Sequence, residues 1–365
     1  MSPERLARTK MGYAARNVEQ LQALAEPLAL ITGADIRPET GDLMLARVAG
    51  LGHHARLQLF TTRKAALYVG DEIVVVCSAR YAPDQFQADL PVNLEGCHLV
   101  ATGGVAASVV SAHRAMREPT RLVPLGLLAT TEGRRLNLVD HAPVGSGPAP
   151  ASRPPIIVVA GNAMNTGKTT AAVHLVRGLS QAGLRVGAAK VTGTVSYEDV
   201  LAMQDAGAVL ARDFTDGGYA TTVGLSIERL RGLFGGLIAE LTRAGSEVVV
   251  IEIADGLLQA ETAALLRDAE CQRWIDGLLF ATRDALGAIE GARRLREWGL
   301  PLLGLSGVLT ASPLAMAETR DTVELPIYLS TEIHDAGKGG GGLQLSNPDT
   351  AIGLLRAVNA RNERA

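Results

Sequence analysis

The residues best suited to chemistry form one short loop rich in glycine, lysine and threonine. Gly161 ends the apolar run 156–160, and Gly167, Lys168 and Thr169 begin an amphipathic stretch. A strand that stops at a glycine and restarts as a helix directs backbone N–H groups and the positive helix end toward one point, where a phosphate chain can bind. Lys168 would then reach the β and γ phosphates, and the Thr169 hydroxyl would bind Mg²⁺.

This pattern predicts a site for a nucleotide with Mg²⁺, and ATP is expected rather than GTP. The spacing departs from the usual one, because the position five before Gly167 is Asn162 and the glycine lies one residue earlier. The strand before and the helical run after supply the required context. The alternative is a glycine-rich turn without a ligand. The residues predicted to bind nucleotide are Gly161, Asn162, Asn165, Thr166, Gly167, Lys168, Thr169 and Thr170.

Two acidic residues are candidate ligands for the metal. Glu252 ends the apolar run 248–251, so its carboxylate is expected at the carboxyl edge of a sheet, where a Mg²⁺ ligand or a water-orienting base is needed. A surface acid that only caps the strand is the alternative. Asp199 opens a predicted helix, where it either binds the metal or caps the helix. The predicted metal ligands are therefore Thr169, Asp199 and Glu252.

A second polar loop contains Asp213 and Asp216, followed by Gly217 and Gly218. Glycines allow a loop to move, so this segment fits a substrate or switch loop. A plain turn explains the same residues equally well.

A linker divides the elements that must position these residues. Residues 142–155 are rich in proline and glycine, which remove hydrogen-bond donors and add chain entropy, so we predict no regular element there. Residues 1–141 contain short β-like stretches separated by turns, after a leading helix, and predict a small β-rich domain, either a barrel or a sandwich. Residues 156–365 form the predicted second domain.

Strands and helices alternate after the linker, which predicts a parallel α/β sheet with helices on both faces. Ligands bind beyond the carboxyl ends of such strands, where the glycine-rich loop lies. Helices are expected over 227–243 and 285–298. The expected strands are 156–160, 185–190, 247–253, 277–281, 302–308 and 327–329.

Composition narrows the class of protein. The chain has 365 residues, of which 47% are hydrophobic and 20% charged, so it can bury more than one core. With a formal charge of −3 and 4% aromatic residues, no nucleic-acid partner is expected. No signal peptide and no apolar run of about 20 residues is present, so we expect a cytoplasmic protein without a membrane partner. Cys77, Cys97 and Cys271 form no CxxC pair and are expected to be buried thiols.

The N-terminal half carries weaker signals. The residues after Gly103 and Gly104 are expected to be helical as far as His113. His53 and His54 are adjacent, and neighbouring strand residues face opposite sides, so they cannot easily share one metal. We therefore expect a solvated hairpin position for this pair.

Residues 156–330 resemble dethiobiotin synthetase and its relatives, including the ATP-binding half of cobyrinic acid a,c-diamide synthase. The resemblance rests on the early glycine of the loop, the lysine that ends the second strand, the stretch 198–204 and the glutamate that ends a hydrophobic strand. It implies that Lys168, Thr169, Asp199 and Glu252 bind MgATP. It also implies that Lys190 holds the substrate and the transferred phosphoryl group, and that the protein forms a dimer with a site between subunits.

The chain departs from this family in one important place. The run Glu252-Ile253-Ala254-Asp255-Gly256 replaces a glycine-rich segment and puts a bulky residue and an acid where the family has bare backbone. The identity of the family's substrate is therefore not transferable, and the N-terminal β-rich domain has no counterpart in dethiobiotin synthetase.

The resulting hypothesis is an enzyme that uses MgATP as a ligase or a phosphoryl-transfer enzyme and activates a carboxylate-like group on a small molecule. Lys168, Lys190 and Glu252 are the predicted catalytic residues. The alternative is a nucleotide-gated binding or maturation protein in which slow hydrolysis resets the state. A nucleic-acid kinase is disfavoured, because no basic stripe with interleaved aromatic residues is present.

Overall fold

The computed structural model describes residues 1–365 except 24–25, 34, 331–332 and 334–365. The chain divides into two compact units, which are described separately. The first contains residues 1–144 together with 194–197 and 214–224, and the second contains 145–193, 198–213 and the residues from 225 onward. The predicted division assigned every residue after 155 to one domain, whereas the contacts group two loops of that segment with the first unit.

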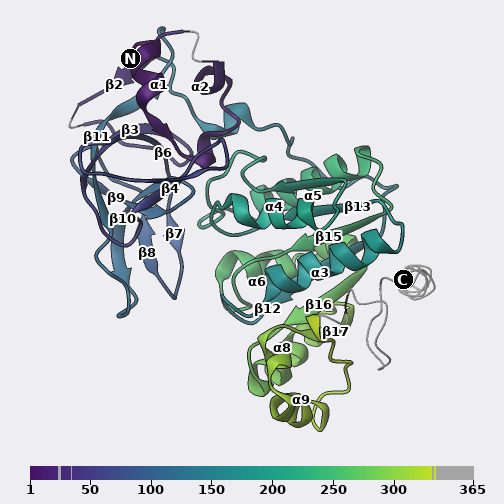
Figure 1. Ribbon diagram of the computed structural model, residues 1–365. Helices are drawn as coiled ribbons and strands as arrows, with labels where there is room; N and C mark the ends of the chain where they lie inside the picture. Colours follow the sequence, from purple (N-terminus) through teal and green to yellow (C-terminus); the bar gives the residue numbers. More distant parts are fainter. Residues whose placement is uncertain (24–25, 34, 331–332, 334–365) are drawn as a thin grey trace. The chain divides into compact units, whose positions relative to one another are not determined.

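Five strands of the first unit close into a ring (Figure 1). Strand β6 pairs with β3, β3 with β11, β11 with β9, β9 with β10, and β10 again with β6. The predicted β-rich, barrel-like domain is confirmed by this closure, which leaves no free edge within the ring. The bounds are β3 Leu43–Gly50, β6 Glu72–Cys77, β9 Cys97–Ala101, β10 Val105–Ala112 and β11 Thr120–Ala129.

Shorter elements flank the ring. Buried apolar side chains fill it, among them Met44, Ile73, Leu99 and Leu122.

Strand β10 shows that the helix predicted after Gly104 was wrong. Its first residues are buried and pair with β9, so the tertiary partner decides the conformation of a run of small residues. The flanking elements are α1 Pro3–Arg8, β1 Lys10–Met11, α2 Glu19–Ala23, β2 Ala29–Ile31, β4 Arg56–Gln58, β5 Lys64–Ala66, β7 Arg80–Tyr81 and β8 Phe86–Asp89.

His54 was expected in solvent and instead lies buried in the first unit, 5% exposed, against the ring of Phe86. Its Nε2 atom lies 3.4 Å from Nη1 of Arg80. Burial, and then the positive charge of Arg80, lower the pKa of His54 to about 3. The imidazole is therefore neutral in the folded protein at neutral pH.

We expect acid to destabilise the first unit through this histidine. The unfolded chain binds a proton at the ordinary pKa of about 6.5, whereas the folded chain binds it only near 3. Stability is therefore fully present above pH 6.5 and falls as the pH drops toward 3, by about 2 kcal/mol at pH 5. Hydrogen exchange of peptides from β3, β6 and β9 between pH 6.5 and pH 3 measures this loss of stability. His54→Gln should flatten the dependence, and His113→Gln, at an exposed position, should leave it unchanged.

The second unit is a six-stranded parallel sheet in the order β14-β13-β15-β12-β16-β17 (Figure 1). From the centre of the sheet, some connections lead toward the β14 edge and others toward the β17 edge. Because such connections are right-handed, the helices of the two sets lie on opposite faces of the sheet. The predicted α/β fold with both faces covered is confirmed. The strands are β12 Ile156–Gly161, β13 Val186–Lys190, β14 Leu210–Asp213, β15 Val248–Glu252, β16 Gly277–Ala281 and β17 Leu302–Ser306.

The helices lie where the alternating pattern placed them. One buried cluster joins α3 and α4 to the sheet through Leu175, Leu179, Met203 and Val250. Residues 327–329 were expected to form a strand, but only a single bridge joins Ile327 to Leu305. The helices are α3 Lys168–Gln181, α4 Tyr197–Asp205, α5 Ile227–Arg243, α6 Ala260–Arg267, α7 Ala269–Trp274, α8 Ala285–Glu297 and α9 Pro313–Arg320.

All three cysteines are free and buried, as predicted. Within the described residues, no helix combines the length and the apolar character needed to cross a bilayer.

Candidate functional site

The loop between β12 and α3 has the shape that a phosphate chain requires. Asn165 and Gly167 both adopt the left-handed conformation, with φ of 56° and 90°, and α3 begins at Lys168. Alternating handedness of this kind turns successive N–H groups to one side. A Cβ atom on Gly161 would lie 2.6 Å from Oγ1 of Thr166. Gly161 is therefore required because the loop folds back over it.

Lys168 lies inside this loop. Its Nζ atom donates to the carbonyl oxygen of Ala163 at 2.6 Å, and the residue is only 6% exposed. Burial lowers the pKa of its ammonium group to about 8, although the carboxylates of Glu252 and Asp255 act against the shift. A neutral carbonyl compensates a buried cation poorly. A phosphate at this point would supply the opposite charge and a stronger hydrogen bond.

Glu252 links the loop to the centre of the sheet. It ends β15, which pairs with both β12 and β13, and it is 1% exposed. The Thr169 hydroxyl donates to its Oε1 atom at 3.0 Å. Its Oε2 atom is buried and has no hydrogen-bond partner among the described residues. A buried carboxylate oxygen without a partner is costly unless a ligand completes it.

These oxygens fit Mg²⁺. A threonine hydroxyl and a carboxylate are the hard donors that this ion prefers, and it keeps the rest of its shell for water and phosphate. No group of three or more histidine, cysteine, aspartate or glutamate side chains among the described residues is placed to hold a metal alone. An ion here would therefore depend on Thr169, Glu252 and the phosphates together, with Asp199 close by.

Lys190 joins the two predicted metal-binding acids. Its Nζ atom lies 2.6 Å from Oδ2 of Asp199 and 3.6 Å from Oε1 of Glu252. Burial alone would lower the pKa of Lys190, but the two carboxylates outweigh it and raise this pKa above its ordinary value. The ammonium is thus a permanent charge at the carboxyl edge of the sheet, where Lys190 is the register partner of Glu252.

The other loop residues surround this centre. Asn162 turns its backbone N–H toward the carbonyl of Ala281 at 3.3 Å, so that group does not face the phosphate position. Thr166 donates its hydroxyl to Ala163 at 3.2 Å, which fixes the turn. Asn165 and Thr170 are exposed. The roles predicted for these four in nucleotide binding remain predictions.

The loop that contains Asp213 and Asp216 forms a turn at residues 214–218, directly after β14. Asp213 ends β14, is 1% exposed, and pairs in register with Lys190. Asp216 belongs to the first unit, where it accepts a hydrogen bond from Arg16 at 2.7 Å and is 5% exposed. Both acids are therefore buried, and a role of this loop in substrate binding or switching stays a prediction.

Asp255 was left out of the predicted site, although it lies beside it. The residue is 9% exposed, and its carboxylate interacts electrostatically with Lys190 and Lys168. The sequence held one signal, an acid where the resembled family has bare glycine.

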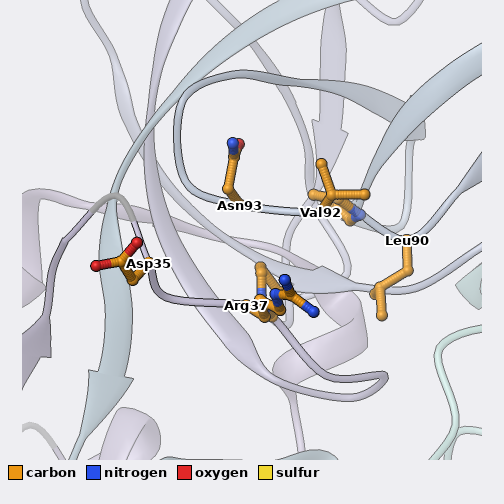
Figure 2. A pocket seen from close by; sticks show the side chains of 7 residues that line it. Asp35, Arg37, Leu90, Val92 and Asn93 are labelled. Carbon is orange, nitrogen blue, oxygen red and sulfur yellow. The ribbon is translucent and has the colours of Figure 1, made fainter.

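A pocket of about 600 Å³ lies in the first unit (Figure 2). Figure 2 shows Asp35 and Arg37 on one segment, and Leu90, Val92 and Asn93 on another. None of the predicted site residues lines it, and we assign it no role.

Comparisons with known proteins give fold-level likenesses only. No protein-family model matches the chain, and no curated protein does. The signal recognition particle receptor FtsY from Elizabethkingia anophelis is 15% identical, with a TM-score of 0.37 over 58% of this chain and 68% of its own. A DUF1611 family protein from Anabaena variabilis is 14% identical, with a TM-score of 0.40 over 61% and 63%.

The septum site-determining protein MinD from Pyrococcus horikoshii, in complex with Mg-ADP, is 16% identical, with a TM-score of 0.33 over 56% of this chain and 96% of its own. The strand order and the loop between β12 and α3 give the second unit of this chain the architecture of a P-loop α/β fold. Membership of the dethiobiotin synthetase family remains an expectation.

Proposed function

We propose that this chain is a MgATP-dependent phosphoryl-transfer enzyme or ligase that transfers the γ-phosphoryl group to an acceptor oxygen of a small molecule. One observation carries the proposal. Lys168 is buried in the phosphate-binding loop, and Nζ of the half-buried Lys190 lies 3.6 Å from Oε1 of Glu252, whose other oxygen is buried without a partner among the described residues. A nucleotide-binding site that only anchored phosphate would need the loop lysine alone.

Each residue has a separate role in this proposal. Backbone N–H groups of the loop and Lys168 bind the phosphates. Thr169, Glu252 and Asp199 would hold Mg²⁺, which when bound neutralises charge on the phosphoryl oxygens. Lys190 stabilises the charge that develops on the transferred group and orients the acceptor. The resemblance implies a carboxylate-like acceptor, but the chain departs from the family at Asp255, so the proposal is stated for an acceptor oxygen in general.

Lys190→Gln tests the enzymatic role. Glutamine keeps most of the length and an N–H donor for Asp199 but removes the charge. We expect turnover to fall about 10²-fold while nucleotide affinity changes less than about threefold, because the charge acts chiefly in the transition state. Measuring turnover and nucleotide affinity on the same preparation checks this. Arg185→Gln, which removes an exposed positive charge next to the other end of β13, is the control. Equal losses of affinity and turnover would count against the role.

A second candidate, a nucleotide-gated binding protein, is favoured by one observation. The loops 194–197 and 214–224, which follow β13 and β14, belong to the first unit. Loops in that position are the ones that reorder when a γ-phosphate binds or leaves. In such a protein Lys190→Gln would leave a slow hydrolysis rate nearly unchanged, so the same experiment separates the two functions.

A further inference from the structure

Asp255 combines three features that each cost free energy. Its φ of 64° is in the left-handed region, which a residue with a Cβ rarely adopts. The residue as a whole is only 9% exposed. No hydrogen bond or ion pair joins its carboxylate to any residue in the described part of the chain. The oxygens of Asp255 are not among the fully buried atoms that lack a hydrogen-bond partner, so the carboxylate is largely desolvated but still accessible from the solvent side, where a ligand can reach it.

The loop around Asp255 is fixed from both sides. The carbonyl oxygen of Ala254 accepts hydrogen bonds from the Thr262 and Thr192 hydroxyls, at 2.9 and 3.4 Å. Gly256 packs against the phosphate-binding loop so closely that a Cβ atom would lie 2.3 Å from the carbonyl oxygen of Asn162. The strained conformation is therefore imposed by the neighbouring backbone, and it holds Asp255 next to the phosphate site.

The charges around Asp255 include both lysines of the candidate site. Lys190 and Lys168 attract its carboxylate, and Glu261 and Glu252 repel it. Burial raises the pKa of Asp255 in spite of the two lysines. A carboxylate so close to a triphosphate repels it, which makes the residue a poor choice for nucleotide binding. The same group suits proton transfer from a nucleophile that attacks the phosphorus.

We infer that Asp255 is a further catalytic residue, the base that accepts a proton from an O–H nucleophile as that oxygen attacks the γ-phosphorus. The bond from this oxygen to phosphorus forms, the bond from phosphorus to the β,γ-bridging oxygen breaks, the proton passes to the Asp255 carboxylate, and the nucleoside diphosphate leaves. The inference rests on the proposed function and narrows its acceptor to an oxygen that still carries a proton, namely water or a hydroxyl group. A carboxylate acceptor has no such proton.

Two substitutions separate catalysis from backbone strain. Asparagine and glycine both tolerate the left-handed conformation, so neither Asp255→Asn nor Asp255→Gly should unfold the loop. Hydrolysis of MgATP and of MgGTP, with water as the nucleophile, is the assay. We expect turnover of both variants to fall about 10²-fold, because a general base contributes at least that factor. Nucleotide affinity should be equal to that of the wild type or tighter, since a repelling charge is removed.

Formate provides a readout that a structural role would not change. The glycine variant leaves room for a small carboxylate, so formate should restore part of its turnover and should not affect Asp255→Asn. Wild-type turnover in Asp255→Asn, or no rescue of Asp255→Gly by formate, would overturn the inference. Nucleotide binding by the wild type without turnover in water would overturn it as well. Absence of nucleotide binding would instead overturn the proposed function itself.

Discussion

Lys168→Ala is expected to abolish measurable nucleotide binding while the protein stays folded. The ammonium is buried with a neutral carbonyl as its hydrogen-bond partner, so its removal costs the ligand-free fold little and relieves a desolvated charge. The bound state loses a charge-assisted contact with two phosphates. We expect ATP affinity, measured by calorimetry, to weaken at least about 10²-fold, and turnover to vanish with it.

Lys64→Ala is the matched control, because Lys64 is an exposed lysine of the first unit. Its affinity for ATP should equal that of the wild type. Thermal melting of both variants in the absence of nucleotide should coincide with the wild type within a few degrees. Unchanged ATP affinity in Lys168→Ala would show that the loop is a structural turn.

The sequence predicts the parts of the second unit that are buried on both faces. Residues 156–160 and 248–251 are uninterrupted apolar runs; the first leads through Gly161 into the loop with Lys168, and the second ends at Glu252. Because parallel strands share a carboxyl edge, the convergence of Lys168, Lys190 and Glu252 follows from the pattern alone.

The elements that were missed lack such a signal. Strand β14 is short, its burial alternates, and it contains Arg212 and Asp213, so its four residues resemble a turn. Strand β10 begins with valine and alanine, which fit a helix or a strand equally well until a neighbour pairs with them. His54 was misplaced for the same reason, because its burial depends on Phe86, which is distant in sequence.

Asp255 shows what the spacing of residues in the sequence cannot predict about the site. Its position after the strand was evident, but its missing partners and its backbone conformation are tertiary facts. A departure from a resembled family is therefore informative in itself, because it marks where the local chemistry of this chain differs.

Glu252→Gln is expected to produce the second large effect, a loss of Mg²⁺ dependence. Glutamine keeps the shape of the side chain and one oxygen for the Thr169 hydroxyl, which now lies 3.0 Å from Oε1. It removes the negative charge and replaces an acceptor oxygen by an N–H₂ group, which cannot bind a cation. Turnover should fall by about 10² or more, and the Mg²⁺ concentration for half-maximal turnover should rise at least about tenfold.

Titrating Mg²⁺ at saturating ATP measures both quantities. Glu247→Gln is the control, because this exposed glutamate directly precedes β15, at the end of the strand remote from Glu252. Glu252→Gln also tests the balance of charge around Lys190. In this variant Lys190 would keep one acidic partner, Asp199, whose Oδ2 atom lies 2.6 Å from its Nζ atom. A protein in which Glu252 only compensates Lys190 would lose stability and keep the wild-type Mg²⁺ curve. If Glu252 binds the metal, the variant would lose the wild-type dependence of turnover on Mg²⁺. It would keep most of its stability, because Asp199 still pairs with Lys190.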